Sequence, residues 1–434
     1  MPEETPLSEE EALIRTLVRK YESRLRQALK KQPQTLEQIE DTAEHVGNQS
    51  KRDIEQQLIT EQGTGECGQQ TACACGKPAR YIGDNAKRWV TRHAELCVER
   101  AYYYCRACAK GFCPLDARLG LVGEYSPAVV ALSARFAAYL PPRAAARELH
   151  DVCGIALSPN TLARHARQVG QVLQADWEQA EAAWEAHPDK EVEARPKQLQ
   201  MTLDGVMVHV AGAWQEVKLG CAYTRQEESG VEQARYSATL SKSAVFGKRF
   251  AVLGHLAGAA HCRKVGIVAD GAEWIWAEVG KYYPTQVQIL DYYHGSAHLW
   301  EVAHLRFGHG SDAAKVWMAR QQKRLLADGI ETVIADVAAW EATTLLQQEG
   351  QRRVLVYLRT HARRMRYETF GKQGYHIGSG VIEAGCKAVV QARLKGPGMR
   401  WSAAGAEAIL QLRCAVCSTE RPNFRLLARQ ALAA

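Results

Sequence analysis

The stretch IVADGAEW, residues 267–274, decides the predicted fold because it joins a short buried strand to an acidic side chain. The apolar run that ends at Ala269 is typical of a strand buried within a sheet. Asp270 follows at once, and Gly271 then opens a segment compatible with a helix. An ionised carboxylate at a buried edge needs a partner, because its desolvation is costly. We expect Asp270 to face such a partner, whereas the simpler alternative is a turn formed by an Asp-Gly pair.

Strand-like and helix-like segments surround this stretch in a regular order. The predicted strands are residues 199–210, 214–224, 234–240, 264–271 and 285–294. Short connections join the first three strands into a meander, helix-like residues 242–260 precede the fourth, and the fifth runs into another helix. The order βββαβαβα is that of the RNase H-like fold, in which the first and fourth strands are neighbours. The prediction is therefore a multidomain α+β or α/β protein with an RNase H-like core.

A second Asp-Gly pair, at Asp204, ends the apolar half of the first predicted strand. Neighbouring first and fourth strands would bring Asp204 and Asp270 to one edge of the sheet. Two carboxylates so placed raise each other's pKa unless cations neutralise them, and Mg²⁺ prefers oxygen ligands. A third acid, Glu383, is expected on a helix within GSGVIEAGCKAVVQARLKGPGMRWS, residues 378–402. These three acids are the predicted magnesium ligands.

Basic residues cluster downstream of Glu383. Lys387 shares the face of Glu383 at helical spacing, and Arg393, Lys395 and Arg400 follow. Further arginines continue to Arg429, and the whole chain carries a formal net charge of +7. Such a local excess is expected of a nucleic-acid surface, with a solvated basic tail as the alternative.

The chain has thirteen cysteines, and two pairs of them predict a zinc site. Cys105-x2-Cys108 has the spacing of a zinc knuckle, whereas Cys73-x-Cys75 is tighter, so Cys67 or Cys113 could replace one of its members. β-like runs at 79–82, 88–92 and 98–104 lie between or beside the pairs. A structural zinc ribbon with one Zn²⁺ is expected, against the alternative of free cysteines.

Residues 143–170 predict a helix, a glycine-containing turn and a second helix. Ser158 can cap the second helix, which has Pro159 at its first position and would display Thr161, Arg164, His165 and Arg167. This pattern fits a DNA-binding helix-turn-helix, and an ordinary helical hairpin in a core is the alternative.

The remaining segments predict helices and a cytoplasmic protein. Leucines and a tyrosine spaced by four between residues 13 and 29 form one apolar stripe on a helix, and residues 295–370 have helical composition. Asp291-x2-His294 stands at the entrance of that second segment, and His298 follows His294 at i, i+4. Capping or support of a neighbouring site is the first interpretation, and a metal site formed by His294 and His298 is the second. The acidic start lacks the layout of a secretory signal, and no apolar run reaches membrane-spanning length.

Several of these segments together resemble a bacterial insertion-sequence transposase of the DDE class, most closely the ISKra-type family. The matching segments are LDGVMV, VADGAEWIW, LDYYHGSAHLW, the run 378–402 and the cysteine region, so the resemblance spans about residues 70 to 415. It implies Asp204, Asp270 and Glu383 as the catalytic triad, holding two Mg²⁺ or Mn²⁺ ions, with Asp291 and His294 in support. Trp401 joins the DNA-binding residues through the GMRWS run. Cys73-x-Cys75 departs from the family, in which two intervening residues are expected.

The resemblance also implies partners and an activity. The expected activity is metal-dependent cleavage and transfer of DNA strands by a homo-oligomer bound to terminal inverted repeats and target DNA, in the bacterial cytoplasm at the nucleoid. The alternatives are a non-catalytic DNA-binding regulator and a nuclease without strand transfer. Three intact acids favour an enzyme, because binding alone does not require them.

The predicted domain organisation follows from these segments. Its parts are an N-terminal helical arm (1–62), a zinc ribbon (63–120), a helix-turn-helix-like region (121–175), the core in two pieces (196–294 and 371–415), a helical insertion (295–370) and a basic tail (416–434).

Overall fold

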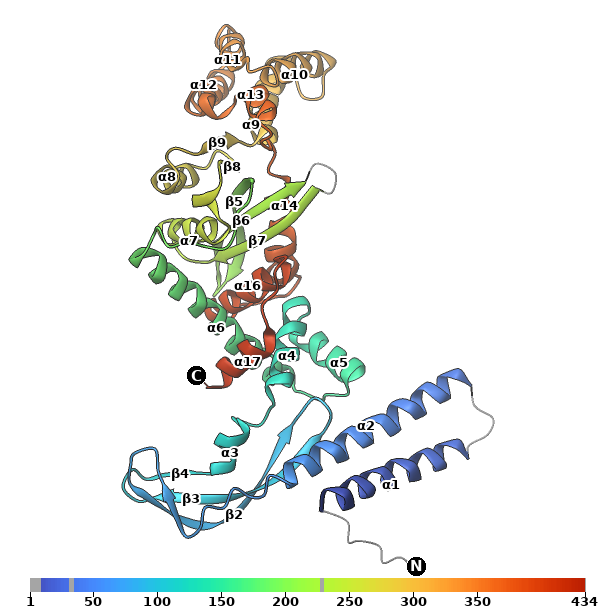
Figure 1. Cartoon of the computed structure of the whole chain (residues 1–434). Helices are drawn as coiled ribbons and strands as arrows, with labels where there is room; N and C mark the ends of the chain where they lie inside the picture. The colour runs from blue at the N-terminus through green and yellow to red at the C-terminus, as the bar shows by residue number, and fades with distance from the viewer. Residues whose placement is uncertain (1–8, 31–34, 227–229, 434) are drawn as a thin grey trace, which may run out of the picture. The chain divides into compact units, whose positions relative to one another are not determined.

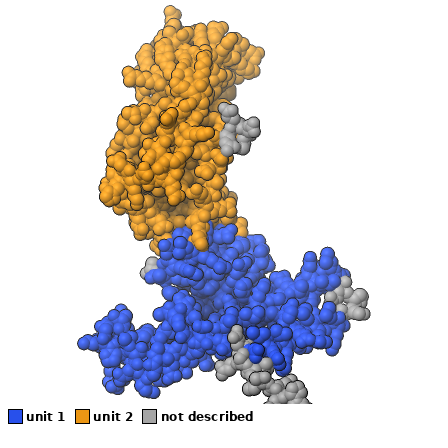
Figure 2. Space-filling view, in the orientation of Figure 1, with its two compact units in different colours: residues 1–136, 142–165, 424–434 blue, residues 137–141, 166–423 orange. Residues whose placement is uncertain are grey.

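The computed structural model describes residues 9–30, 35–226 and 230–433 as helices and two separate β-sheets (Figure 1). The chain divides into two compact units, shown in Figure 2. The first comprises residues 1–136, 142–165 and 424–434, and the second comprises residues 137–141 and 166–423. None of the described helices is long and apolar enough to cross a membrane.

The first unit begins with two helices, where the sequence predicted one helical stripe. These are α1 (Glu9–Leu29) and α2 (Leu36–Thr60), which pack against each other. Thr35 begins α2 with a capping box, since its hydroxyl accepts from the Gln38 N–H and the Gln38 side chain accepts from the Thr35 N–H. An ion pair of 2.6 Å between Arg24 and Asp53 joins the two helices.

A four-stranded antiparallel sheet follows in the order β1-β2-β3-β4. Its strands are β1 (Gln70–Ala72), β2 (Pro78–Val90), β3 (Glu95–Cys105) and β4 (Lys110–Phe112). The runs 79–82 and 88–92, predicted as separate, are one strand with a register shift between Tyr81 and Gly83. Gly83 has φ +150°, a backbone angle that residues with side chains rarely adopt. The glycine therefore permits the register shift, and the strand continues beyond it.

Two helices form the predicted helix-turn-helix segment. These are α5 (Pro142–Cys153) and the start of α6 (Pro159–Ala186). Gly154, with φ +66°, ends the first helix in the left-handed region. Ser158 Oγ accepts the Thr161 N–H at 3.0 Å, so the predicted cap is confirmed. The first unit also contains α3 (Pro114–Leu119) and α17 (Phe424–Ala433), whereas α4 (Pro127–Tyr139) ends at the passage to the second unit.

The second unit is built on a mixed five-stranded sheet in the order β7-β6-β5-β8-β9. Its strands are β5 (Gln198–Val210), β6 (Ala213–Gln226), β7 (Gly230–Thr239), β8 (Lys264–Ala269) and β9 (Val287–Leu290). The first three are antiparallel, while β5, β8 and β9 run parallel to one another. The predicted meander and the predicted pairing of the first and fourth strands are therefore confirmed. β8 and β9 are shorter than predicted, and both end just before an aspartate.

Helices cover the two faces of this sheet (Figure 1). A Cβ added to Gly220 of β6 would lie 2.8 Å from Phe250 of α7 (Ser243–Leu256). The preceding residue, Leu219, points to the opposite face, where a Cβ on Gly385 of α14 (Gly380–Gly385) would lie 3.4 Å from it. The chain continues from α14 through a π-helical turn η3 (Cys386–Gln391) and α15 (Ala392–Leu394) to α16 (Ala403–Cys417).

Helices follow β8 and β9, and the segment 295–370 is helical as its composition predicted. They are α8 (Glu273–Tyr282), α9 (Tyr292–Phe307), α10 (Asp312–Leu325), α11 (Ile330–Ala338), α12 (Leu345–His361) and α13 (Tyr367–Lys372). A short 3₁₀ turn, η2 (Ala362–Arg364), joins α12 to α13, and another, η1 (Ala259–His261), precedes β8. The apolar faces of these helices share one core with β5, β8 and β9, which includes Leu299, Val333 and Leu358. The insertion thereby packs onto the strands whose ends carry the candidate site.

Candidate active site and metal centre

Three aspartates directly follow residues that are paired across the three parallel strands. Leu203 of β5 pairs with Ala269 of β8, which pairs with Leu290 of β9. The next residue in each strand direction is Asp204, Asp270 or Asp291, respectively. Adjacent strands lie about 4.8 Å apart, so these residues start from neighbouring backbone positions at one edge of the sheet.

Asp204 is half-buried on the face of the sheet that α14 covers. Its Oδ1 accepts the Gly205 N–H at 2.7 Å, and Cys386 Sγ lies 3.4 Å from its Oδ2. Burial raises the pKa of Asp204, and the charge of Asp270 raises it further against the lowering effect of these hydrogen bonds. The carboxylate is thus held in a site that disfavours its charge and would gain from a cation.

Asp270 both forms an Asp-Gly turn and lies beside another acid, the two interpretations that its sequence allowed. Its Oδ1 accepts the Ala272 N–H at 3.0 Å, and its carbonyl accepts Trp276 Nε1 at 2.7 Å, so it forms a local turn at the start of α8. The turn leaves it next to Asp204, whose pKa responds to its charge. The turn and the pairing of acids therefore coexist.

Asp291 is completely buried and caps α9. Its Oδ1 accepts the backbone N–H of His294 at 2.6 Å and contacts His294 Nδ1 at 3.1 Å. Its Oδ2 accepts the Ser379 N–H at 2.5 Å. Burial raises the pKa of Asp291, but these hydrogen bonds outweigh burial and hold it below the ordinary value. Both carboxylate oxygens already accept hydrogen bonds from these donors. Asp291 is therefore better suited to positioning its neighbours than to binding a metal.

His294 is half exposed and lies within electrostatic reach of all three aspartates. Its hydrogen bond to Asp291 raises its pKa, burial opposes this, and the charges of Asp291, Asp270 and Asp204 raise the pKa further. These interactions favour a protonated imidazole beside the acidic edge.

Glu383 is exposed on α14, where the sequence placed it on a helix. Ser379 Oγ donates to Glu383 Oε1 at 3.2 Å, while the Ser379 backbone N–H binds Asp291. Cys386 connects the same segment to Asp204. Sequence reasoning missed Ser379 and Cys386, although both lie within four residues of Glu383.

The three predicted ligands lie at one edge without forming a closed cluster. Among residues 9–30, 35–226 and 230–433, the one group of three or more His, Cys, Asp or Glu ligand atoms within 4.8 Å of each other is formed by cysteines. Asp204, Asp270 and Glu383 therefore stand farther apart than ligands around one ion. All three offer carboxylate oxygens, the donor type that Mg²⁺ and Mn²⁺ prefer, so the donor chemistry fits the predicted metal.

The segment after Glu383 departs from the regular helix that was predicted. Residues Cys386–Gln391 form a π-helical turn, which alters the spacing of faces beyond Glu383. Lys387 is exposed, whereas Gln391 is half-buried. The face that Lys387 was predicted to share with Glu383 therefore does not continue to Gln391 as a straight α-helical row.

The predicted DNA-binding residues differ in exposure. Lys387, Lys395, Arg400, Arg164 and Arg167 are exposed, and Trp401 is half-buried. The prediction for Arg393 is wrong, because it is only 1% exposed. Its Nε donates to the Ala137 carbonyl at 3.1 Å, and its guanidinium lies over the Trp401 ring. A side chain so enclosed supports packing and cannot reach a phosphate.

His165 also has a role that the sequence did not predict. It is 2% exposed, its Nδ1 lies 3.1 Å from Ser133 Oγ, and it contacts the Tyr125 ring edge. Burial lowers its pKa to about 4, with a smaller contribution from Arg164. Its expected place on the displayed face of the second helix is therefore wrong, whereas Arg164 and Arg167 of that helix are exposed.

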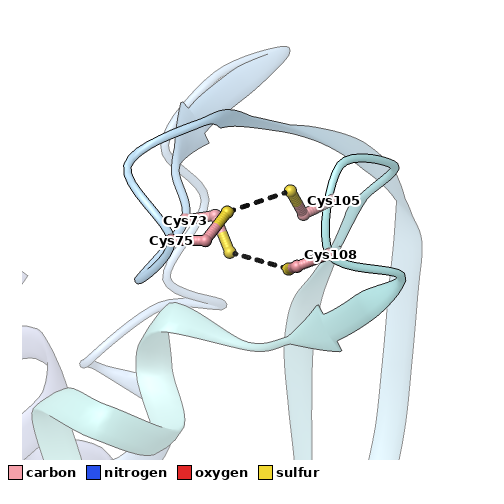
Figure 3. A group of neighbouring side chains, drawn as sticks. All are labelled: Cys73, Cys75, Cys105 and Cys108. Atoms are coloured by element: carbon pink, nitrogen blue, oxygen red, sulfur yellow. Dashed lines mark hydrogen bonds between the residues drawn. The ribbon is translucent and has the colours of Figure 1, made fainter.

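Four cysteines in the first unit form the metal-compatible cluster (Figure 3). They are Cys73, Cys75, Cys105 and Cys108, whose sulfur atoms all lie within 4.8 Å of one another. The Cys73–Cys108 and Cys75–Cys105 sulfur distances are 3.6 and 3.7 Å. Tetrahedral Zn²⁺ with Zn–S bonds of about 2.3 Å requires sulfur separations near 3.8 Å. The four thiols thus fit one structural zinc ion.

The structure also shows which cysteines could bind the zinc ion. Cys67 is exposed with its Sγ 3.4 Å from the Gly65 carbonyl, and Cys113 is buried at the start of α3. Neither belongs to the cluster, so the tight Cys73-x-Cys75 pair is the correct one. The Cys108 backbone N–H lowers the pKa of Cys105 to about 7, which favours the thiolate that a metal binds.

Comparison of the chain with models of known protein families and with curated protein sequences finds no match in either set.

Proposed function

We propose that this protein is a DDE-class transposase that cleaves and transfers DNA strands in a metal-dependent reaction, with an RNase H-like core. The observation that carries the proposal is the position of Asp204 and Asp270. They follow paired residues of adjacent parallel strands, although sixty-odd residues separate them in the chain. The strand order β7-β6-β5-β8-β9 and the following helices agree with the element order of that fold.

Asp204, Asp270 and Glu383 would hold two Mg²⁺ or Mn²⁺ ions in this proposal. When bound, such ions activate a water or a DNA 3′-hydroxyl and stabilise the leaving oxygen. Asp204 follows the strand beside that of Asp270 and is joined through Cys386 to the segment that carries Glu383, so it would help to hold these ions. The raised pKa of Asp204 supports this role, because a site that disfavours the bare charge gains most from neutralisation.

The neighbouring residues would orient these acids. Asp291 fixes the backbone at Ser379, and the Ser379 hydroxyl contacts Glu383. His294 is held by the same carboxylate. Asp291, Ser379 and His294 are therefore positioning residues, since their contacts act on the site through other groups.

The DNA would be held by basic side chains outside the acidic edge. Lys387, Lys395 and Arg400 are exposed in the segment after Glu383, and Trp401 pairs with the end of β5 through its backbone. Arg164 and Arg167 on α6 would add contacts from the helix-turn-helix segment, and the zinc ribbon would contribute to recognition of the terminal repeats.

Mapping of cleaved strands tests this function. The protein is incubated with labelled duplex DNA carrying the sequences that flank its gene, with and without Mg²⁺, and the products are mapped on both strands. Cuts at defined ends followed by joining to a second duplex support a transposase. Cuts without joining indicate a nuclease, and tight binding without cuts in any divalent metal indicates a DNA-binding regulator.

A further inference from the structure

The helix α1 carries an exposed stripe of apolar side chains. The members of this α1 stripe are Ile14, Val18, Tyr21 and Leu25. Their exposed fractions are 52, 55, 45 and 36%, respectively, so all four are open to solvent. Spacings of four, three and four residues make them neighbours on one face, which is the pattern of a helix that packs against another helix.

The helix α2 lies beside α1 (Figure 1) but packs on a different face of it. Arg24 pairs with Asp53 of α2 at 2.6 Å. Leu13 and Leu17 lie on the same face as Arg24 at helical spacing, and both are half-buried. With 3.6 residues per turn, that face is about a quarter turn from the α1 stripe. The spacing of four that the sequence shows from Leu13 to Leu29 therefore winds by about 40° per step, from α2 into solvent.

The α1 stripe is larger than the single exposed apolar side chains of an ordinary surface. Neighbouring apolar residues over about three helical turns form a continuous patch, which is typical of an interaction site. Such a patch binds best to an apolar ridge of the same spacing, because the side chains of each helix then fill the spaces of the other. A second α1 helix provides that ridge.

Two exposed charges beside the stripe fit a second α1 helix that runs in the opposite direction. Arg15 and Glu22 are seven residues apart and lie on the edge of the stripe that faces away from α2. In an antiparallel pair, Ile14 would pack against Leu25 of the second copy. The same register would bring Arg15 beside Glu22 of the second copy. Two-fold symmetry repeats this contact, so opposite charges would meet twice.

We propose that the α1 stripe binds a second copy of this chain, with the two α1 helices packed in antiparallel orientation. The surface is self-complementary in both its apolar side chains and its charges. Glu22 already pairs with Arg26 of its own helix at 2.6 Å, but its side chain is 51% exposed, which leaves room for Arg15 of the second copy. The dimer requires neither DNA nor a bound metal, so it stands independently of the proposed function.

Sedimentation of the full chain without DNA tests this dimer. The parent should sediment with the mass of two chains. Val18→Glu combined with Leu25→Glu should dimerise about 10²-fold more weakly, because each copy would bury two unpaired charges. The matched control is Thr16→Glu combined with Ser23→Glu, which adds the same charge at the same spacing on an exposed face away from the stripe. The control should dimerise within threefold of the parent. A parent that is monomeric at every concentration, or a stripe variant that dimerises as the parent does, would overturn the proposal.

Charge reversal tests the orientation without altering the α1 stripe. Arg15→Glu and Glu22→Arg each place like charges opposite each other, so each should weaken dimerisation by about threefold or more. An equal mixture of the two variants should form heterodimers, because both contacts then join opposite charges. The variant with both changes should return to within about twofold of the parental affinity. Loss of either recovery would rule out the antiparallel dimer. Failure of the DNA-cleavage experiment would leave these results unaffected, since no DNA is present.

Discussion

Cys386 Sγ lies 3.4 Å from Asp204 Oδ2, although 182 positions separate the two residues in the chain. Cys386 stands three residues after Glu383, so this contact ties the segment that carries the third acid to the strand that carries the first. The contact joins these two segments without requiring the predicted ligands Asp204 and Glu383 to contact each other. It also explains why Glu383 can be exposed and still belong to the same edge of the sheet.

Neutral variants of the three acids should abolish strand cleavage and retain DNA binding. Asp204→Asn, Asp270→Asn and Glu383→Gln each keep the side-chain shape and remove the charge that attracts a cation. The Tm of metal-free Asp204→Asn should be equal to or above that of the parent, because burial already disfavours the ionised form. Cleavage assays, DNA-binding assays and thermal melts check this together. Asp312→Asn, at a position whose side chain is 95% exposed, is the control and should cleave normally. If Asp270→Asn cleaves DNA at the rate of the parent protein, the role of Asp270 is limited to forming the turn.

Loss of Cys105 or Cys108 should remove zinc from the purified protein. Cys105→Ser or Cys108→Ser takes one of four sulfur ligands from a segment with little apolar mass of its own. Structural zinc can contribute ~10–16 kcal/mol to local folding, so residues 67–113 should also become sensitive to protease. Elemental analysis and limited proteolysis measure the two effects. Cys67→Ser lies outside the cluster and should retain one zinc per chain. Parent protein without stoichiometric zinc would contradict the assignment.

The basic segment after Glu383 should determine the salt dependence of DNA binding. Replacing Lys395 and Arg400 together with glutamine removes two exposed charges, and each phosphate contact adds about 0.9 to the slope of log affinity against log salt. The slope should therefore become shallower by about 2 when affinity is titrated from low to high salt. The control replaces Lys315 of α10 and Arg352 of α12, which are exposed and paired with an acid of the same helix. Equal slopes for the parent and the Lys395/Arg400 variant would show that these residues face away from DNA.

Acid should destabilise the protein through His165. Its folded-state pKa is about 4, while the unfolded side chain titrates near the ordinary value of 6.5. Between these values the unfolded chain binds a proton that the folded chain does not, so stability falls as the pH is lowered from about 6.5 toward 4. From pH 7 to pH 5 this amounts to about 2 kcal/mol, and His165→Asn should lose that part of the pH dependence. Thermal melts at both pH values measure it. His150→Asn, at an exposed position, should keep the full dependence of the parent.

Ser379 should influence the reaction through Glu383. Ser379→Ala removes the hydroxyl that contacts Glu383 Oε1 at 3.2 Å and keeps the backbone N–H that binds Asp291. Hydrogen bonds to charged groups contribute about 1.5–3 kcal/mol, so the cleavage rate should fall by roughly tenfold or more while DNA affinity is retained. Ser379→Thr preserves a hydroxyl and should recover most of the rate. Equal rates for the alanine and threonine variants would remove Ser379 from the positioning residues.

Local patterns in the sequence were sufficient to predict the elements of the second unit. Alternating and continuous apolar runs identified β5, β6 and β7, and the short apolar runs before Asp270 and Asp291 identified β8 and β9. The element order then predicted that β5 and β8 are neighbours, which the pairing of Leu203 with Ala269 confirms. Cysteine spacing identified the metal-compatible cluster, and Ser158 followed by proline identified the start of α6. These features depend on residues close in the chain or on a small number of permitted topologies.

Tertiary structure alone decided which polar side chains meet and which are enclosed. Arg393 and His165 are buried although their local sequence suits a displayed face, because segments distant in sequence cover them. Ser379 reaches Asp291 across 88 positions, and Tyr357 reaches the residue after Asp270 through the packing of the helical insertion. The periodicity of a helix or strand determines the face on which a side chain lies. What covers that face depends on contacts made by the rest of the folded chain, and no window of neighbouring residues contains that information.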